Sequence, residues 1–140
     1  MSYNLFLDDF RIPADGFNIL GRNEYLKLKW VVVRSHNEFV DYILKNGMPD
    51  LISFDHDLAD EHYAPPQFWD EKYNQWAEKK GFKEKTGMDS AKWLVEFCMD
   101  NKVSLPNYFV HSMNSAGRAN IQGLLDNYSK FEKQNDKENS

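Results

Sequence analysis

Residues of the types that bind cations, move protons or hold phosphate collect just after three short apolar runs of this chain. The runs span residues 4–7, 51–54 and 108–110, and the polar residues that follow them are Asp8, Asp9 and Arg11; Asp55, His56 and Asp57; and His111, Ser112, Asn114 and Arg118. Carboxylates bind hard divalent cations, imidazoles transfer protons near neutral pH, and arginine pairs with phosphate. These residue types favour chemistry on a phosphate ester if the fold brings the three ends together.

The elements that must position these residues alternate between strands and helices. Short apolar or β-branched runs predict strands at 4–7, 30–33, 51–54 and 108–110. Ser35 and Thr86 are capping residues that predict helices after them, and a last helix is expected from about Asn114. Residues 10–28 show no clean period and are predicted to be mostly loop. The order predicts an α/β fold with a parallel sheet, in which a ligand lies beyond the carboxyl ends of the strands.

Three carboxylates are expected to meet at that edge of the sheet, namely Asp8, Asp9 and Asp55. They would repel one another, and Mg²⁺ or Mn²⁺ with oxygen ligands would relieve the repulsion. A divalent metal held by these three residues is therefore the expected cofactor. The alternative is that one or two of the acids only cap turns.

Two histidines at strand ends, His56 and His111, are candidates for a general acid and base in phosphodiester cleavage. Asp57 would orient one of them. The histidines could also ligate a transition metal, and His111 could instead be a buried structural histidine. His36 and His62 have no such context and are expected on the surface.

The helix expected near Asn114 adds a candidate anion site. Free backbone amides at a helix N-terminus attract anions, and Arg118 adds a bidentate partner for phosphate. Arg11 is expected to hold phosphate as well, and Ser112 could help to hold it or act as a nucleophile. Alternatively, Asn114 is a plain cap and Arg118 pairs with one of the acids. No catalytic partner is recognisable for Ser112, which disfavours a serine hydrolase.

Residues 59–85 interrupt the alternation and read as an insertion with a short helix near 67–79. The segment is rich in aromatic residues and carries the lysines 79, 80, 83 and 85. It could form a lid that stacks on a nucleobase. The alternative is a surface loop that packs on the domain or on another subunit.

Length and charge limit the classes of protein. The 140 residues fit one domain, predicted over 1–130, followed by a polar and disordered tail over 131–140. A net charge of −5 argues against binding of duplex DNA. The lone cysteine, Cys98, excludes a disulfide framework or a cysteine zinc site within the chain. The N-terminus does not resemble a signal peptide and no apolar run is long enough for a membrane span, so a cytoplasmic location is expected.

Four blocks of the sequence resemble the cyclic-phosphate-processing receiver-like domain family, a relative of response-regulator receiver domains: LFLDDFR, PDLISFDHDL, TGMDSAKWLVEF and YFVHSMNSAGRANIQGLL. The resemblance implies a receiver-like (flavodoxin-like) three-layer sandwich, here with a short four-stranded parallel sheet that lacks a fifth strand. It implies that Asp8 and Asp9 are the metal pair and that Asp55 stands where receivers accept a phosphoryl group. It also implies an enzymatic role on cyclic phosphates.

The leading hypothesis is a phosphoesterase that hydrolyses a cyclic phosphate on a cyclic nucleotide messenger or on a 2′,3′-cyclic RNA end. The two histidines alone could run a metal-free version. A second hypothesis is a protein that sequesters a nucleotide without cleaving it, for example as a phage countermeasure to nucleotide-based immunity. A signalling receiver with Asp55 as phosphoacceptor is disfavoured, because the lysine that receivers carry after a fifth strand is missing.

Overall fold

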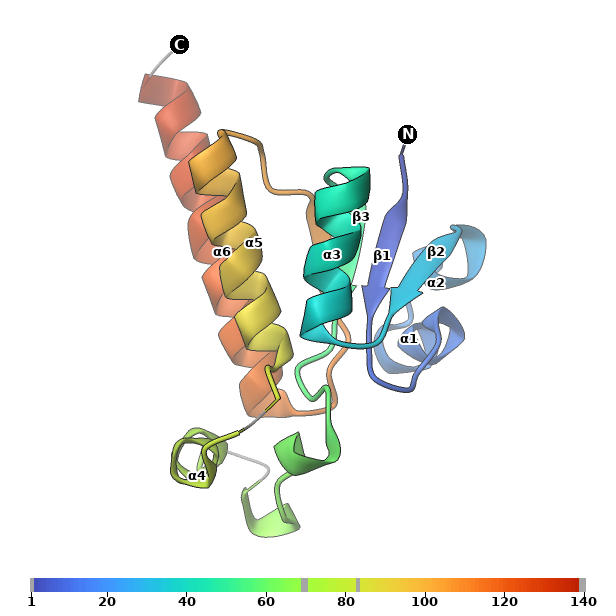
Figure 1. Cartoon of the computed structure of the whole chain (residues 1–140), viewed down its shortest axis with the longest axis vertical. Helices are drawn as coiled ribbons and strands as arrows, with labels where there is room; N and C mark the ends of the chain where they lie inside the picture. The colour runs from blue at the N-terminus through green and yellow to red at the C-terminus, as the bar shows by residue number, and fades with distance from the viewer. Residues whose placement is uncertain (1, 69–70, 83, 139–140) are drawn as a thin grey trace.

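The computed structural model describes residues 2–68, 71–82 and 84–138 of the chain. Its centre is a sheet of four strands, which are β1 (Asn4–Leu7), β2 (Trp30–Val33), β3 (Leu51–Phe54) and β4 (Asn107–Val110). The strands run parallel in the order β2-β1-β3-β4 (Figure 1). The four predicted strands and the parallel sheet are therefore confirmed.

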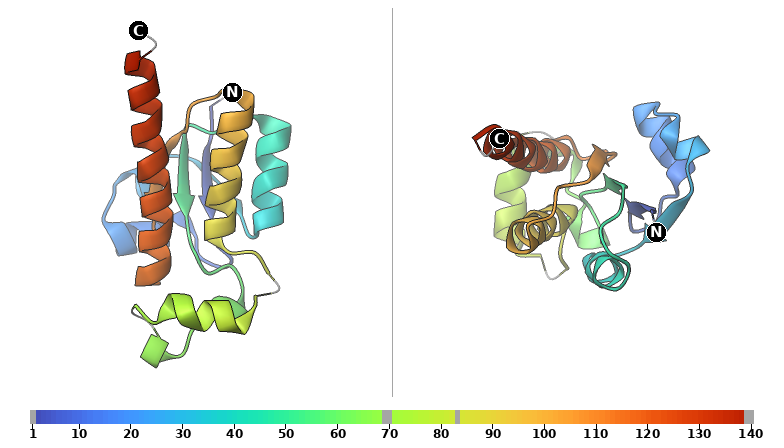
Figure 2. Two further views of the ribbon diagram at one scale, coloured as in Figure 1. Left: turned by 90° about the vertical axis from the view of Figure 1, so that its left-hand side faces the viewer. Right: turned by 90° about the horizontal axis from the view of Figure 1, so that it is seen from above.

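Helices cover both faces of the sheet. α3 (His36–Asn46) and α5 (Gly87–Asn101) pack on one face, α1 (Pro13–Leu20) and α2 (Glu24–Lys27) lie on the other, and α6 (Ser115–Glu138) runs beside α5 on the β4 side (Figures 1 and 2). Leu5 and Leu7 of β1 and Phe54 of β3 are fully buried in the main apolar core. Phe6, between the two leucines, points to the α1–α2 face and meets Tyr25 there. The three-layer receiver-like α/β fold is thus present.

The prediction of loop over residues 10–28 is wrong, because this segment forms α1 and α2. Pro13 occupies the first position of α1, and Asp15 accepts a hydrogen bond from the backbone N–H of Ile12 at 2.9 Å. Gly21 ends the helix in the left-handed conformation (φ 68°). Proline and glycine here are the start and stop signals of a short helix and not signs of a loop.

The structure also corrects the prediction for the C-terminal segment. α6 continues to Glu138, so residues 131–138 are helical and do not form the disordered tail that was expected; residues 139–140 lie outside the described residues. Ile121 and Leu125 on the buried face of α6 belong to the core. In the described part of the chain, no helix combines the length and apolar character needed to cross a membrane.

The segment 59–85 lies beyond the carboxyl edge of the sheet (Figure 1). It contains the 3₁₀ turns η1 (Asp60–His62) and η2 (Pro66–Phe68) and the helix α4 (Tyr73–Lys80), close to the expected short helix. Trp76 contacts the rings of Phe68, Tyr73 and Phe82, so these aromatic side chains pack on one another. Three residues of the predicted lid, Trp69, Asp70 and Lys83, lie outside the described residues.

His62 is fully buried, which corrects its expected place on the surface. Its Nδ1 accepts the backbone N–H of Leu58 at 2.8 Å, and its Nε2 donates to the carbonyl oxygen of Glu84 at 2.8 Å. The side chain therefore ties together the two ends of the segment, a contact between distant positions that local pattern cannot reveal. His36 is half-buried, with Nδ1 at 2.9 Å from Ser90 Oγ.

Two glycines allow helices to approach the end of β3 closely. The N–H of Gly87, at the start of α5, donates to the carbonyl oxygen of His56 at 2.8 Å. A Cβ at Gly87 would fall far inside contact distance of the carbonyl oxygen of Asp55, and a Cβ at Gly117 of α6 would overlap the ring of His56. Both helices thus press directly on the chain that follows β3.

We expect Gly87→Ala to lower the free energy of unfolding by about 1–3 kcal/mol, because the methyl group meets backbone that cannot move aside. Gly123→Ala is the control, since a Cβ there meets no atom of the described residues within 4 Å. That variant should gain about 0.5–1 kcal/mol, the ordinary effect of replacing a helix glycine. Urea unfolding followed by circular dichroism measures both. Equal effects of the two substitutions would contradict the close approach.

Candidate active site

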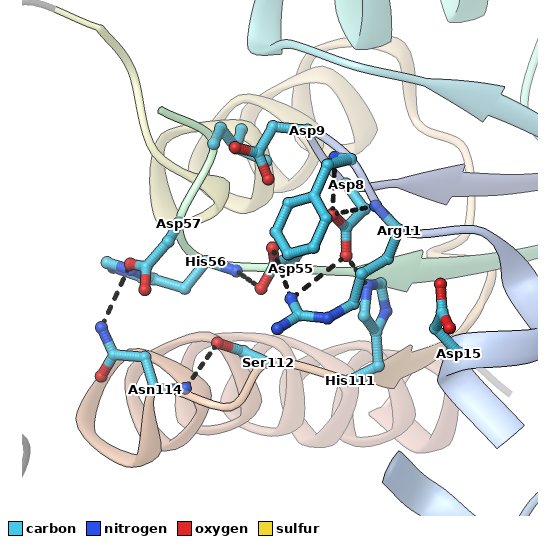
Figure 3. Close-up of polar contacts among 12 residues, drawn as sticks. Asp8, Asp9, Arg11, Asp15, Asp55, His56, Asp57, His111, Ser112 and Asn114 are labelled. Atoms are coloured by element: carbon cyan, nitrogen blue, oxygen red, sulfur yellow. Dashed lines mark hydrogen bonds and ion pairs between the residues drawn. The ribbon is translucent and has the colours of Figure 1, made fainter. Parts of the chain in front are cut away.

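Polar residues after three strands lie together at the carboxyl edge of the sheet (Figure 3). Asp8 follows β1, residues 55–57 follow β3 and His111 follows β4. The parallel register pairs the last residue of β1 with that of β3, and the last residue of β3 with that of β4. Residues up to about a hundred positions apart in the sequence therefore meet, as the alternation of elements predicts.

Asp8 is fully buried, and both its carboxylate oxygens accept hydrogen bonds. Oδ1 accepts the backbone N–H groups of Phe10 at 3.0 Å and Arg11 at 2.9 Å, and Oδ2 accepts from His111 Nε2 at 2.9 Å. Burial raises the pKa of Asp8, but the His111 bond and the two backbone donors outweigh it and lower the pKa to about 2. Asp8 is therefore a fixed negative charge at neutral pH.

Asp55 is also buried but is not satisfied. Oδ1 accepts the backbone N–H of His56 at 2.9 Å, whereas Oδ2 has no hydrogen-bond partner among the residues that the structure describes. Burial raises the pKa of Asp55 to about 8, and the charges of Asp8 and Asp57 add to this effect. An unpaired buried oxygen is costly in a folded protein, so this atom marks a place that a ligand or cation would stabilise.

Arg11 brings a positive charge close to both carboxylates. Its Nη1 lies 3.6 Å from Asp8 Oδ2 and 3.7 Å from Asp55 Oδ2. These distances exceed those of direct N–H···O hydrogen bonds, so the guanidinium only partly compensates the two charges. The backbone of the turn is fixed from another side, because Arg34 Nη1 donates to the carbonyl oxygen of Arg11 at 2.6 Å.

His111 lies behind Asp8 and is fully buried. Its Nδ1 is 2.6 Å from Ser53 Oγ, its Nε2 bonds to Asp8, and its ring stacks on Phe6 at 4.4 Å between centroids. Burial lowers the pKa of His111, against the opposing effect of Asp8. The expected direct role of His111 as acid or base on a substrate does not fit this placement, since both ring nitrogens are occupied and the ring does not reach solvent.

Asp57 collects three donors on one oxygen. Its Oδ1 lies 2.7 Å from His56 Nδ1, 3.2 Å from Asn114 Nδ2 and 3.4 Å from the hydroxyl oxygen of Tyr73. The His56 ring packs edge-on against Tyr73 and is only 5% exposed. His56 and Asp57 are thus paired as the sequence predicts, but the geometry favours a histidine that orients the carboxylate.

A cavity of about 390 Å³ opens beside Asp57. Residues from all parts of the edge line it: Arg11, Asp57, Tyr63, Ala64, Tyr73, Met113 and Asn114. The sequence indicates the aromatic segment 59–85 only as a whole and does not single out the three residues of it that line the cavity. The sequence shows only that the segment is rich in aromatic residues. Which of its residues reach the cavity depends on tertiary contacts, which local sequence patterns do not reveal.

Arg118 and Ser112 lie on a neighbouring hollow of about 580 Å³, between α1 and the first turns of α6. Met113 borders both hollows, and Arg118 is exposed. Ser112 is buried, and its Oγ accepts the backbone N–H of Asn114 at 3.1 Å. Asn114 caps α6 through Oδ1, which accepts the backbone N–H of Gly117 at 2.9 Å. Asn114 is therefore both a cap and a wall of the first cavity.

The expected metal ligands are brought together in part. Asp8, Asp55 and His111 form a buried group whose potential ligand atoms all lie within 4.8 Å of one another. Asp9 is not in that group: it is half-buried, its Oδ1 accepts the Tyr63 hydroxyl at 3.4 Å, and burial with the nearby charge of Asp8 raises its pKa to about 6. Since His111 Nε2 already bonds to Asp8, the unpaired Oδ2 of Asp55 and the Oδ2 of Asp8 are the atoms that fit a hard cation.

The family model described as cyclic-phosphate processing receiver domain matches residues 3–127 of the chain. No curated protein and no solved structure matches the sequence.

The unpaired carboxylate oxygen of Asp55 is expected to make the stability of the fold depend on pH. Because the pKa of Asp55 is raised, the folded state binds its proton more tightly than the unfolded state, and this contribution is lost as the pH rises from about 4 through 8. We expect Asp55→Asn to raise the free energy of unfolding at pH 8 by about 1–3 kcal/mol, the range for relieving an unsatisfied buried group.

At pH 4 the same substitution should have little effect. Asp41→Asn, at an exposed position of α3, is the control and should change stability equally at both pH values. Denaturant unfolding at pH 4 and pH 8 makes the comparison. A gain for Asp55→Asn that is independent of pH, or a loss at pH 8, would be inconsistent with an uncompensated carboxylate.

Proposed function

Because the chain belongs to the cyclic-phosphate processing receiver domain family, we propose that it hydrolyses a cyclic phosphate on a small nucleotide or on an RNA end. The observation that carries the proposal is the position of Arg11. Its guanidinium lines the cavity and faces the carboxylates of Asp8 and Asp55 from there, while Asp57 lines the same cavity. A phosphate in the cavity would meet a cation, a fixed acceptor for a proton and a hydrogen-bond donor within one small space.

Arg11 and Asn114 would bind the phosphate. The guanidinium donates to non-bridging oxygens, and the strength of charge-assisted bonds makes arginine suited to this task. Asn114 is anchored by its capping bond to Gly117, so its side chain has little freedom to move. These two residues would orient the ring of the cyclic phosphate against Asp57.

Asp57 would act as the general base. Donors from His56 and Asn114 hold its Oδ1 and fix the direction of the carboxylate. The Tyr73 hydroxyl adds a longer contact, since it also donates to the carbonyl oxygen of His62 at 3.1 Å. In the reaction Asp57 takes a proton from a water molecule, the water oxygen forms a bond to phosphorus, and one ring P–O bond breaks. The leaving alkoxide takes a proton from solvent at the open mouth of the cavity. In this scheme His56 positions the base, and His111 supports Asp8.

A divalent metal fits the carboxylates behind Arg11. Asp8 is ionised and Asp55 has an unpaired oxygen, so the two would hold Mg²⁺ or Mn²⁺ through their Oδ2 atoms. When bound, such an ion would neutralise charge that develops on the phosphate oxygens. Asp8 and Asp55 would therefore bind the ion, and Arg11 and Asp57 would contact the substrate and water.

The direct test is a turnover assay. Purified protein is incubated with cyclic mononucleotides, cyclic oligonucleotides and RNA with 2′,3′-cyclic ends, in Mn²⁺, Mg²⁺ or EDTA, and products are separated by chromatography. The proposal predicts a linear phosphate monoester or diester product that requires metal. Loss of free ligand without product, with the ligand recovered intact after heat denaturation, would instead identify a sequestering protein.

Substitution of the base gives the sharpest contrast. Asp57→Asn keeps the shape and one acceptor oxygen but removes the base, so kcat should fall by roughly 10²- to 10⁴-fold. Asp126→Asn is the matched control, since Asp126 accepts the Tyr108 hydroxyl at 2.6 Å on α6, outside the residues that line the cavity. Its activity should be that of the wild type. Equal activity of both variants would remove Asp57 from the mechanism.

Arg118 distinguishes short from long substrates. It is one helical turn from Asn114 on the neighbouring hollow, where a second phosphate of an RNA end would lie. We expect Arg118→Ala to raise KM for the RNA end by roughly twofold to fivefold, the scale of an exposed ion pair, and to leave a cyclic mononucleotide unaffected.

Arg22→Ala is the control for this effect, because Arg22 lines a hollow elsewhere, with Asn4 and Asp50. Steady-state kinetics on both substrates give the answer. A change of the same size for the mononucleotide would contradict a second phosphate position.

A further inference from the structure

Buried polar side chains form a continuous chain from α2 to Asp8. The hydroxyl oxygens of Tyr25 and Ser53 lie 2.6 Å apart, and Ser53 Oγ lies 2.6 Å from His111 Nδ1. His111 Nε2 then lies 2.9 Å from Asp8 Oδ2. Tyr25 is 3% exposed and the other three residues are fully buried. Four separate parts of the fold therefore contribute to one hydrogen-bonded line, and that line ends at a carboxylate of the candidate site.

One direction of donation satisfies every member of this chain. The ionised carboxylate of Asp8 can only accept, so His111 Nε2 carries the hydrogen. In the neutral ring Nδ1 then accepts from the Ser53 hydroxyl, and the Ser53 oxygen accepts from the hydroxyl of Tyr25. His111 is thus the Nε2–H tautomer, and no polar atom in the line lacks a partner.

Ring packing fixes the positions of the two aromatic members of the line, His111 and Tyr25. His111 stacks nearly parallel on Phe6, with an angle of 9° between the ring planes. Tyr25 stacks on Trp30 with 5.4 Å between ring centroids. Gly16 of α1 leaves room for the Tyr25 ring, because a Cβ at that position would lie 2.6 Å from Tyr25 Cε1. The rings therefore have little freedom to rotate away from their hydrogen bonds.

We propose that Tyr25 and Ser53 are positioning residues for the cation site: through His111 they hold Asp8 Oδ2 in the orientation that a divalent ion between Asp8 and Asp55 requires. Apolar side chains would fill the same interior without the cost of burying four polar groups. The line instead ends on the ionised carboxylate beside the orphaned oxygen of Asp55. The inference rests on the proposed function only for its consequence in turnover.

Tyr25→Phe tests the inference because it removes one hydroxyl and keeps the ring that packs on Trp30. The Ser53 hydroxyl then loses its outer partner, and the orientation of His111 is less restricted. We expect the affinity for Mn²⁺, measured by calorimetry, to fall by roughly threefold to tenfold, below the range for direct neighbours of metal ligands. In ¹⁵N NMR spectra, His111 of the wild type should be the Nε2–H tautomer, and the fraction of that tautomer should fall in the variant.

Tyr108→Phe is the matched control. It also removes a tyrosine hydroxyl with a 2.6 Å hydrogen bond, here to Asp126. The control should lose comparable thermal stability but keep the wild-type affinity for Mn²⁺ and the wild-type tautomer of His111. Equal Mn²⁺ affinities for the two variants, an Nδ1–H tautomer in the wild type, or no binding of Mn²⁺ to the wild type would overturn the inference.

The experiments distinguish a failure of the positioning role of Tyr25 from a failure of the proposed hydrolase function. A Mn²⁺ affinity that falls in Tyr25→Phe, in a protein that converts no cyclic phosphate, would retain the positioning role and remove the hydrolase. Turnover that requires metal, with Mn²⁺ affinity unchanged by Tyr25→Phe, would retain the hydrolase and remove the positioning role. Where turnover is found, kcat of Tyr25→Phe should fall while KM stays the same, because Tyr25 is not among the described residues that line the cavity.

Discussion

The repulsion among three buried carboxylates at one edge of the sheet is the constraint on which the site depends. Asp8, Asp55 and Asp57 follow strands that the parallel register brings side by side, so the fold itself enforces their proximity. The protein satisfies two of them with hydrogen bonds, Asp8 through backbone and histidine donors and Asp57 through three side chains. Asp55 keeps an unpaired oxygen, and its pKa is raised to about 8. The unfavourable electrostatic energy of the three carboxylates is therefore least relieved at Asp55 Oδ2, and a cation bound at this atom would relieve it.

The surrounding elements are arranged around that constraint. Glycines at 87 and 117 let α5 and α6 press on the chain after β3, and the turn after β1 directs Arg11 back over the acids. The helices α1 and α2 bring Tyr25 under the sheet, where the line of hydrogen bonds to Asp8 begins. The segment 59–85 supplies Tyr73 to Asp57 and part of the cavity wall. Glycines, a polar turn, two short helices and an aromatic insertion therefore all help to build the site at one edge of the sheet.

Local patterns in the sequence were sufficient for the strands, the main helices and the residues at the strand ends. They failed where a long-range contact decides the outcome. Tyr25 lies in a segment that was predicted to be loop, and His62 is buried because it bonds to both ends of an insertion. Ser53 had one visible signal, a hydroxyl within an otherwise apolar strand. The sequence could not show which of His56 and Asp57 contacts a ligand, since this depends on which of the two adjacent side chains faces the cavity.

Hydrolysis at this edge is the central claim, and ³¹P NMR tests it most directly. A 2′,3′-cyclic nucleotide gives a phosphorus resonance well separated from that of the monoester it would become. With wild-type protein and Mg²⁺ the cyclic signal should be replaced by the monoester signal, and with Asp57→Asn it should persist. A cyclic signal that stays unchanged with wild-type protein, both for this nucleotide and for an RNA with a cyclic end, would contradict the account.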